Sequence, residues 1–407
     1  MSISLLQHTQ GIQGYQLLRE EYSSGTYTAY LTPKKSIQRC KACRSFNVTA
    51  TAVSQRTVKA LPFGTKKTTL KVKMHRLRCH DCSAYLMEQI LFTSSSSSRI
   101  SKQLERTLLD LRKHMSIKAA AEYYGVAWNT VKEVEKSHLQ KKYNYINLKS
   151  VSAIGIDEIF MGQSLGEKGY LTIVRDLDSG AVLHVGKGKK GSALDEFSVR
   201  AKRSLAPIKT IAVDLAPSFT SWISQHFPNA VIVYDHFHVI KLMNDKLNSI
   251  RRRTMNRLEE HEKKELKNRR WHFVINKESL NTKATKELQR CNDLFSELGT
   301  AYGLKESLRN IYSLANDADF AEIAFKRWID LARESRIPEL KTMAKTLEKH
   351  LEGVLAFWTT KGVTSASMEG FNNKIGWLTR QAYGYRDEEY LILKIYDLPK
   401  LKMRREL

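Results

Sequence analysis

Two aspartates end short apolar segments in a pattern that predicts a metal site. Asp157 ends the apolar run that begins at Val151, and Asp214 ends the run 211–213. Apolar runs of this length between turn signals are typical of buried strands, and the carboxyl ends of such strands form the rim where α/β proteins carry out chemistry. Carboxylates about 4 Å apart repel each other by about 4 kcal/mol at an effective dielectric constant of about 20. A Mg²⁺ or Mn²⁺ ion between them would relieve that repulsion and could support phosphodiester cleavage.

A third carboxylate comes from near the end of the chain. Ser365 can cap a helix, and Glu369 lies in the first turn of the segment that follows, which is dense in polar and cationic groups. A helix packed across the sheet would bring Glu369 to the rim, so we predict that it is the third metal ligand. Glu158, by contrast, should point to the other side of its strand from Asp157, because successive side chains of a strand alternate.

The residues around the two aspartates predict the sheet that positions them. Strands are expected over 151–157, 170–175, 181–185, 208–213 and 230–234, with helices over 192–203 and 218–227. Three antiparallel strands followed by alternating helices and parallel strands describe a ribonuclease H-like α/β catalytic domain. The first and fourth strands of that topology are neighbours, so Asp157 and Asp214 are expected to face one site.

A long charged segment separates the fifth strand from Glu369. From 239 to about 362 the sequence is rich in charge and has little strand signal, which predicts an α-helical insertion in the catalytic domain. Basic side chains here and in the segment that follows are candidate contacts to DNA phosphates, although a solvated helix face is an equally good interpretation for any one of them. These candidates are Arg251, Arg252, Arg253, Lys374 and Arg380.

Two cysteine pairs predict a second kind of metal site. The pairs have Cys-x-x-Cys spacing and are 35 residues apart: Cys40 with Cys43, and Cys79 with Cys82. Two thiolate pairs, each in a tight knuckle, suit tetrahedral Zn²⁺, and the strand-like sequence between them predicts an enlarged zinc ribbon. His75 and His80 are rival ligands, but four thiolates complete a closed structural site without them.

Residues 116–142 predict two short helices joined by a tight turn. Gly125 supplies a left-handed turn between an alanine-rich helix and a second helix that starts at Trp128. This pattern is typical of a helix-turn-helix, whose second helix enters the major groove; an ordinary pair of packed helices is the alternative. The side chains expected to face DNA are Asn129, Thr130 and Lys132.

The composition favours a polyanionic partner. Lys and Arg total 67 against 42 for Asp and Glu, which gives a formal net charge of +25. An excess of this size is typical of nucleic-acid-binding proteins, although a ribosome or a membrane surface would fit the charge alone. No apolar run approaches the ~18 to 20 residues that span a bilayer, and the N-terminal segment lacks the basic start of a signal peptide. We therefore expect a cytoplasmic protein with no membrane partner.

Taken together, these motifs resemble the transposases of the ISL-three family of bacterial insertion sequences. The resemblance extends over nearly the whole chain, and its most specific parts are Glu-Gly-Phe-Asn-Asn-Lys-Ile at 369–375 and Gln-Ala-Tyr-Gly-Tyr-Arg at 381–386. It implies a DDE recombinase that uses Mg²⁺, with Asp157, Asp214 and Glu369 as the catalytic triad. It also implies that the partners are the terminal inverted repeats of the element and target DNA, bound near the bacterial nucleoid. A homodimer or larger assembly is expected, because two ends must be joined.

The second catalytic aspartate has a rival. Asp235-His-Phe-His238 resembles the [C/D]-x-x-H motif that Mutator-like transposases carry after the fifth strand, where it is distinct from the triad. Asp235 could instead be the second catalytic aspartate in place of Asp214. The predicted topology favours Asp214, because the fourth strand borders the first. His238 is expected either to orient a ligand or a phosphate, or to be a structural histidine.

The expected organisation is a multidomain α+β protein. A zinc-ribbon domain over 1–98 and a helix-turn-helix domain over 99–148 would bind DNA. The catalytic domain would comprise 149–239 and 363–407, on either side of the insertion over 240–362. Two other functions remain open: a metal-dependent nuclease of the same fold without strand transfer, and a regulator that binds DNA without catalysis.

Overall fold

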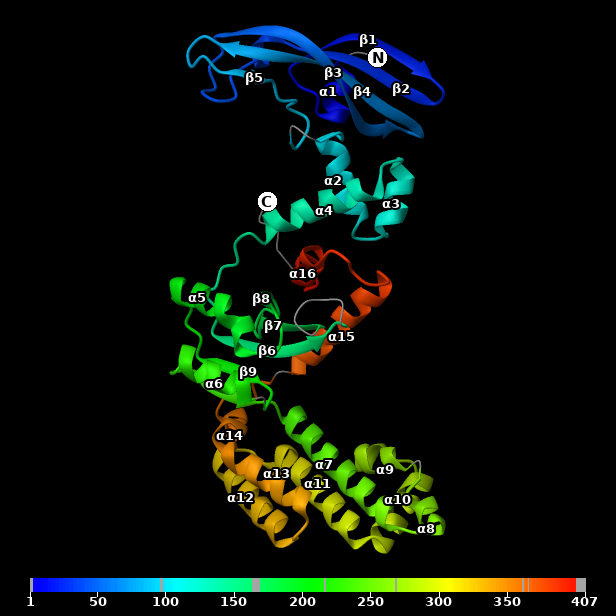
Figure 1. Ribbon diagram of the computed structural model, residues 1–407, viewed down its shortest axis with the longest axis vertical. Helices are drawn as coiled ribbons and strands as arrows, with labels where there is room; N and C mark the ends of the chain where they lie inside the picture. The colour runs from blue at the N-terminus through cyan, green and yellow to red at the C-terminus, as the bar shows by residue number, and fades with distance from the viewer. Residues whose placement is uncertain are drawn as a thin grey trace. The chain divides into compact units, whose positions relative to one another are not determined.

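The computed structural model describes residues 3–95, 98–162, 169–215, 217–267, 269–360, 362–364 and 366–399. The fold is mixed α+β with two sheets, and the chain divides into two compact units, Met1–Lys142 and Tyr143–Leu407 (Figure 1). Ser365, expected to cap a helix, lies outside the described residues. None of the described helices is both long enough and apolar enough to cross a membrane.

The first unit is built on a five-stranded sheet with the order β1-β2-β4-β3, in which β5 also pairs with β4. Its elements are α1 (Ile3–Gln10), β1 (Tyr15–Ser23), β2 (Thr26–Pro33), η1 (Lys35–Ile37), β3 (Val48–Phe63), β4 (Lys66–Cys79) and β5 (Tyr85–Met87). Along β4 the buried Leu70, Val72 and Met74 alternate with more exposed basic residues, as their sequence pattern predicts. The long β3–β4 hairpin carries both cysteine pairs at one end.

Three helices complete this unit: α2 (Lys102–Leu111), α3 (Ile117–Tyr124) and α4 (Trp128–Lys142). Ser101 and Ser116 cap α2 and α3 by accepting hydrogen bonds from backbone amides. Gly125 ends α3 with φ 60°, the left-handed conformation expected for it. The ion pair between Arg112 and Glu135, 2.7 Å long and largely buried, ties α2 to α4.

The serine-rich segment between sheet and helices is held by hydrogen bonds where it is described. Ser94 and Ser98 both donate to the Glu105 carboxylate on α2. The backbone amide of Lys59 on β3 donates to the carbonyl of Arg99. Sheet and helices therefore belong to one compact unit.

The second unit is built around a sheet with the order β10-β9-β6-β7-β8. Its elements are β6 (Ala153–Phe160), β7 (Tyr170–Asp176), β8 (Val182–Lys187), η3 (Gly191–Leu194), α5 (Asp195–Arg203), β9 (Thr210–Val213), α6 (Pro217–His226) and β10 (Val231–Tyr234). β7 is antiparallel to both β6 and β8, whereas β9 and β10 run parallel to β6. The five predicted strands are confirmed, with boundaries within a few residues.

One detail of the prediction was wrong: Asp157 does not end its strand. β6 continues to Phe160 and pairs with β7 along its whole length, so Asp157 lies in mid-strand opposite Ile173. β9, however, pairs with β6 only as far as Gly155 and Ala212. The apolar pattern predicted that the strand ends at Asp157 because apolar residues mark buried positions. The side chains of β6 become less buried where β9 stops pairing with one edge of the strand.

Helices cover both faces of this sheet. One face packs against α5 and α6 in a core that includes Ile154, Ile156 and Val213. The other packs against α15 (Ala366–Gln381) and α16 (Glu388–Asp397). Gly155 is required on this second face, because a β-carbon there would lie 3.1 Å from Met368 of α15.

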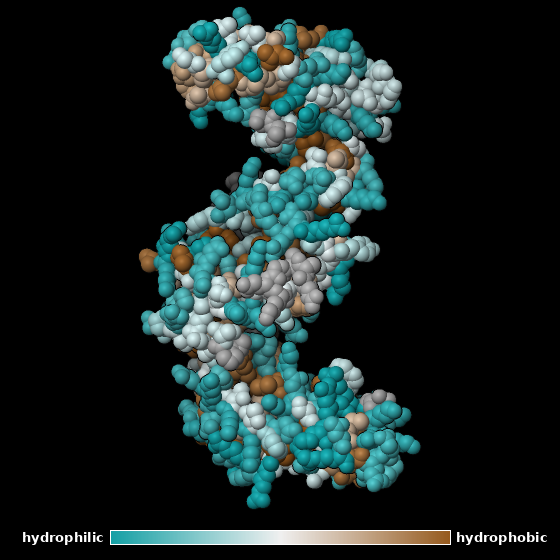
Figure 2. Space-filling model, viewed as in Figure 1, coloured by the Kyte–Doolittle hydropathy of each residue, from teal (hydrophilic) through white to brown (hydrophobic). Residues whose placement is uncertain are grey.

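Helices fill the segment between β10 and α15 (Figure 1). They are α7 (His236–Arg257), α8 (Glu260–Leu266), α9 (Arg270–Val274), η4 (Lys277–Ser279), α10 (Thr282–Leu294), α11 (Ser296–Leu314), α12 (Ala318–Glu334), α13 (Pro338–Lys349) and α14 (Leu351–Thr359). Their core is continuous with that of the sheet, and on the face drawn in Figure 2 their surface is mostly hydrophilic. The ammonium of buried Lys305 on α11 donates to the carbonyls of Phe273 and Ile275, which fastens α9 to α11.

Candidate functional site

Asp157 is held from two sides. One carboxylate oxygen accepts the backbone N–H of Glu158 at 2.8 Å, and the other accepts the side-chain amide of Asn372 at 2.7 Å. Asn372 belongs to α15, which lies against β6 (Figure 1). The hydrogen bonds fix the orientation of this carboxylate and link the sheet to the helix that carries Glu369.

Asp214 lies beside Asp157. The last paired residues of β6 and β9 are Gly155 and Ala212. Asp157 follows two positions later within β6, and Asp214 follows two positions later, directly after β9. Burial raises the pKa of Asp157; the Glu158 amide and the charge of His238 lower it, and the negative charge of Asp214 raises it. The charge of Lys241 lowers it as well. The two carboxylates therefore share one electrostatic environment, faced by His238 and Lys241 at the start of α7.

Asp235 has a different setting. Its side chain is only 2% exposed and caps α7, accepting the backbone N–H of Phe237 at 2.9 Å. Burial, and then the charge of Asp235, raises the pKa of Tyr312 on α11. Asp235 is thus a buried helix cap whose charge reaches Tyr312 in the insertion.

Glu158 is closer to the site than strand alternation predicts. Its pKa is raised from 4.5 to about 7, first by burial and then by the negative charges of Asp214 and Asp157, with Lys189 acting in the opposite direction. A carboxyl group with this pKa gains and loses its proton near neutral pH. The site therefore contains three acidic groups even before Glu369 is counted.

Glu369 is exposed in the first turn of α15. It follows Met368, which packs on Gly155, and precedes Asn372 by one helical turn. Among the described residues, the four cysteines are the one group of three or more His, Cys, Asp or Glu whose ligand atoms all lie within 4.8 Å of one another. Asp157, Asp214 and Glu369 do not come that close together, although the contacts of α15 with β6 keep Glu369 at this end of the sheet.

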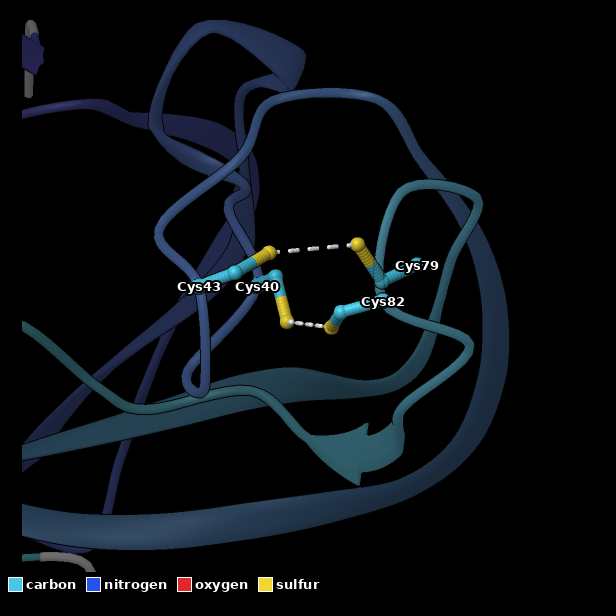
Figure 3. Close-up of side chains that lie close together, drawn as sticks. All are labelled: Cys40, Cys43, Cys79 and Cys82. Carbon is cyan, nitrogen blue, oxygen red and sulfur yellow. Dashed lines mark hydrogen bonds between the residues drawn. The ribbon is translucent and has the colours of Figure 1, made fainter.

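The four cysteines form a second candidate metal site (Figure 3). The Sγ atoms of Cys40 and Cys82 are 3.6 Å apart, and those of Cys43 and Cys79 are 3.5 Å apart. Tetrahedral Zn²⁺ with bonds of about 2.3 Å requires sulfur separations of about 3.8 Å, so the cluster fits structural zinc in a zinc ribbon. Backbone N–H groups of Cys43 and Ala42 lower the pKa of the Cys40 thiol to about 7.

The rival histidines are engaged elsewhere. The ring of His75 pairs with the Glu88 carboxylate at 2.7 Å, and the ring of His80 contacts the Thr49 hydroxyl at 2.7 Å. Each cysteine knuckle ends in a residue with positive φ, Arg44 (64°) or Ser83 (58°), so the two halves of the cluster have matching turns. The cluster is therefore complete with four sulfur ligands.

The predicted DNA contacts of α4 differ in accessibility. Asn129 is exposed, and Thr130 is half-buried. The side chain of Lys132 is only 18% exposed and lies 3.6 Å from the Glu133 carboxylate. Val131 between them is buried in the core of the three helices, so the first turn of α4 presents Asn129 most openly.

The predicted basic cluster of the insertion is only partly available to a ligand. Arg253 makes hydrogen bonds of 2.8 and 3.0 Å to Glu339 and an ion pair of 2.9 Å with Glu297. Arg251 is half-buried and donates to the Asn248 side chain at 3.2 Å. Arg252 is the exposed member of the three, and Lys374 and Arg380 on α15 are exposed too.

Comparison with known proteins places the chain in a family. The family model of the ISL3 DDE transposases, described as "Transposase", matches residues 154–395, more than half of the chain. The chain belongs to the ISL3-family DDE transposases. It is 28% identical over 400 residues to the transposase for insertion sequence element IS1001 of Bordetella parapertussis, a match that covers 96% of this chain and 97% of that relative. It is also 28% identical over 303 residues to the transposase for IS1557 of Mycobacterium tuberculosis, covering 67% of this chain and 66% of that relative.

Among solved structures, the chain is similar to a Drosophila P element transposase strand transfer complex. The likeness has a TM-score of 0.41 and 10% sequence identity, and covers 74% of this chain and 92% of that one.

An ISL3-family DDE transposase cuts and joins DNA with the help of divalent metal ions. The donor set in the second unit suits such ions, because carboxylate and amide oxygens are the ligands that hard cations prefer. Sequence reasoning did not identify Asn372, Lys241 or Lys189 as members of this environment. The one available signal was the position of Asn372, three residues after Glu369 and therefore on the same side of a helix.

Proposed function

We propose that this ISL3-family transposase binds the terminal inverted repeats of its own insertion sequence and catalyses Mg²⁺-dependent cleavage and strand transfer. The observation that carries the proposal is the hydrogen bond from Asn372 to Asp157, which links the helix of Glu369 to the two strands of Asp157 and Asp214. The strand order β8-β7-β6-β9-β10, with the first three strands antiparallel, supports a ribonuclease H-like catalytic domain.

In this proposal Asp157, Asp214 and Glu369 are the catalytic triad and hold Mg²⁺. When bound, two such ions activate the attacking oxygen and stabilise the leaving oxygen of a phosphodiester. Asn372 orients Asp157 by donating to one carboxylate oxygen, while the Glu158 amide holds the other, as residues around a metal ligand commonly do. Lys241 and the ring of His238 face these carboxylates and favour the ionised form of Asp157. The approach of Glu369 to the two aspartates is the step that DNA and metal would complete.

The first unit is the proposed reader of the element ends. Helices α2 to α4 and the turn at Gly125 match a helix-turn-helix, in which Asn129 and Thr130 would meet base edges. The zinc cluster would hold the end of the β3–β4 hairpin rigid and take no part in catalysis. Arg252, Lys374 and Arg380 would contact phosphates in the second unit.

Two element ends must meet for strand transfer, so we propose that a homodimer or larger assembly forms on DNA. The same geometry would also serve a nuclease that cuts without joining. A regulator that only binds DNA would have no use for the paired carboxylates.

A strand-transfer assay with pre-cut element ends separates these functions. The wild-type chain should join the ends to target DNA in Mg²⁺, and Asp157→Ala, Asp214→Ala and Glu369→Ala should each abolish joining while leaving end binding intact. Asp235→Asn is the matched comparison, since it keeps the size of the cap and should retain joining. Cutting without joining would indicate the nuclease, and binding alone would indicate the regulator. Loss of joining in Asp235→Asn with full activity in Asp214→Ala would overturn the triad.

A further inference from the structure

An exposed polar and aromatic stripe runs along α15 away from Glu369. Asn373, Trp377 and Arg380 follow Glu369 at intervals of three or four residues, so all four lie on one side of the helix, and all are exposed. The Trp377 side chain is 58% exposed. Lys374, three residues before Trp377, and Arg386, nine residues after it, are exposed and positively charged. The stripe ends at Tyr383, just beyond the helix.

Tyr383 occupies a position where the fold favours glycine. The helix ends in a Schellman motif: the N–H of Tyr383 bonds to the carbonyl of Arg380, and the N–H of Gly384 bonds to the carbonyl of Thr379. The residue in this left-handed position is usually glycine, yet here it is a tyrosine with φ 53° and a fully exposed side chain, 100% of its reference area. A strained backbone that presents an aromatic ring to solvent contributes nothing to packing, so its purpose lies outside the chain.

Two glycines in α15 also have no packing reason. A β-carbon at Gly370 would meet nothing within 4 Å, and one at Gly376 would meet only the guanidinium of Arg380, at 4.0 Å. Glycine destabilises a helix interior relative to alanine. Gly370 directly follows Glu369, so the helix surface beside the proposed catalytic carboxylate carries no side chain there, although glycine makes the helix less stable. Such a surface suits close approach by a ligand backbone.

We propose that the stripe is a stacking track for the DNA strand next to the cut, with Trp377 and Tyr383 as the platforms for its bases. This inference rests on the proposed function, because it takes Glu369 as the point where the scissile phosphate lies. Positive charge from Lys374, Arg380 and Arg386 matches the sugar-phosphate backbone, and aromatic rings bind any base through its π-face. A protein-docking helix would show a continuous apolar face, whereas this one interleaves aromatic rings with amide and guanidinium groups.

The helix sets the spacing of the contacts. Trp377 is eight residues beyond Glu369, which is about 12 Å along a helix with a rise of ~1.5 Å per residue. One DNA strand advances ~3.4 Å per nucleotide, so Trp377 should meet the base three or four nucleotides (~3.5) from the cut. Tyr383 should meet the base about six nucleotides from it.

Photocrosslinking with 5-iodouracil tests the track, since this base crosslinks efficiently to an aromatic ring stacked on it. End duplexes carry the probe at successive positions from the cut, and are bound to the full chain in Ca²⁺ or without metal, so that no cutting is needed. Crosslinks are expected to map to Trp377 and Tyr383 at the two predicted positions and to fall at least fivefold in Trp377→Ala and Tyr383→Gly, respectively.

A matched control is available on α5. Leu205 has the same helix-end geometry, with φ 49° and the same two backbone hydrogen bonds, and its side chain is 86% exposed. Tyr383→Gly and Leu205→Gly should both raise the melting temperature, but only Tyr383→Gly should lower strand joining, by at least tenfold. Equal joining by Tyr383→Gly and the wild type would overturn the proposal, as would crosslinks that map away from α15. If Tyr383→Gly changed the sedimentation mass of the protein but did not lower the yield of crosslinks to DNA, Tyr383 would lie in a contact between copies of the chain. That result would also overturn the proposal.

The outcome separates this inference from the proposed function. A wild-type chain that crosslinks as predicted but never cuts or joins would keep the track and contradict the catalytic proposal. A chain that joins ends but shows no crosslink on α15 would support the catalytic proposal and contradict the stacking track. Asp157→Ala should abolish joining and leave both crosslinks unchanged.

Discussion

Asn372 donates a 2.7 Å hydrogen bond to the carboxylate of Asp157. This contact joins residues 215 positions apart in the sequence and, together with the packing of Met368 on Gly155, holds α15 against β6. Because Glu369 lies one turn before Asn372 on the same helix, the contact sets how far Glu369 stands from the paired aspartates. The second carboxylate oxygen is held by the Glu158 amide, so each oxygen of Asp157 accepts a hydrogen bond.

The first prediction concerns this orienting contact. Asn372→Ala should lower strand joining about 10- to 100-fold, the usual loss when a residue that orients a metal ligand is removed. The concentration of Mg²⁺ needed for half-maximal activity should rise, because Asp157 must then be ordered by the metal. DNA binding should not change. Asn310→Ala, at an exposed position of α11, is the control; similar activity in both variants would show that the contact has no catalytic role.

A second prediction follows from the raised pKa of Glu158. Its pKa of about 7 in the folded state lies above the ordinary 4.5, so the unfolded chain loses this proton first as the pH rises. The contribution of Glu158 to the free energy of unfolding should therefore fall between about pH 4.5 and pH 7 and stay level above that. Thermal melts between about pH 4.5 and pH 7 should show that the melting temperature falls less with rising pH in Glu158→Gln than in the wild type.

The same titration should couple to metal binding. Cations bind more tightly to deprotonated carboxylates, so the affinity for Mn²⁺ should increase from about pH 6 to about pH 8 and binding should release protons. Calorimetry in two buffers of different ionisation enthalpy measures this release. An identical proton release in Glu158→Gln would assign the titrating proton to another group.

A third prediction concerns the cysteine cluster. The wild-type chain should contain one zinc ion per molecule, and Cys43→Ser or Cys82→Ser should lose it. Because the two knuckles hold the end of the β3–β4 hairpin, the loss should lower the melting temperature of the first unit and weaken DNA binding. Cys291→Ala is the matched control, since this buried cysteine lies in the second unit. Full zinc content in Cys43→Ser would contradict the four-sulfur site.

The arrangement of the second sheet could be predicted because it depends on local patterns. Apolar runs and turn residues define the strands, and the alternation of strands and helices orders them. The mid-strand position of Asp157 could not be predicted, because the apolar character of the sequence falls where the pairing with β9 ends and not where β6 itself ends. The pairing of Asn372 with Asp157 and the elevated pKa of Glu158 depend on tertiary packing, which no local pattern encodes.

The basic residues of the insertion illustrate the same limit. Three consecutive arginines gave no indication of which one was engaged within the fold. The partners of Arg253, Glu297 and Glu339, lie 44 and 86 positions away. Charge composition therefore indicated nucleic acid as the partner correctly, but only the structure distinguishes a structural arginine from an exposed one.

A fourth prediction uses the unexplained glycine beside Glu369. Gly370→Ala should stabilise the protein by about 1 kcal/mol, because alanine is the better helix former and a β-carbon there meets nothing. Strand joining should nevertheless fall, since the added methyl group obstructs the DNA backbone. Gly303→Ala on α11 is the control: its β-carbon would also meet nothing within 4 Å, so stability should rise and joining should be unchanged. Unimpaired joining in Gly370→Ala would mean that the lack of a side chain at this position has no function.

The final prediction separates Arg252 from Arg253. Arg252 is exposed, so Arg252→Ala should leave the melting temperature unchanged and should reduce the slope of log affinity against log salt by about 1, as for one lost phosphate contact. Arg253→Ala should behave in the opposite way. It leaves the partly buried carboxylate of Glu339 without its bidentate partner, which should cost about 1 to 3 kcal/mol of unfolding free energy. Its salt slope should match that of the wild type, measured by titrating end DNA at several salt concentrations. A reduced slope in Arg253→Ala with unchanged stability would show that the ion pairs with Glu339 and Glu297 open when DNA binds.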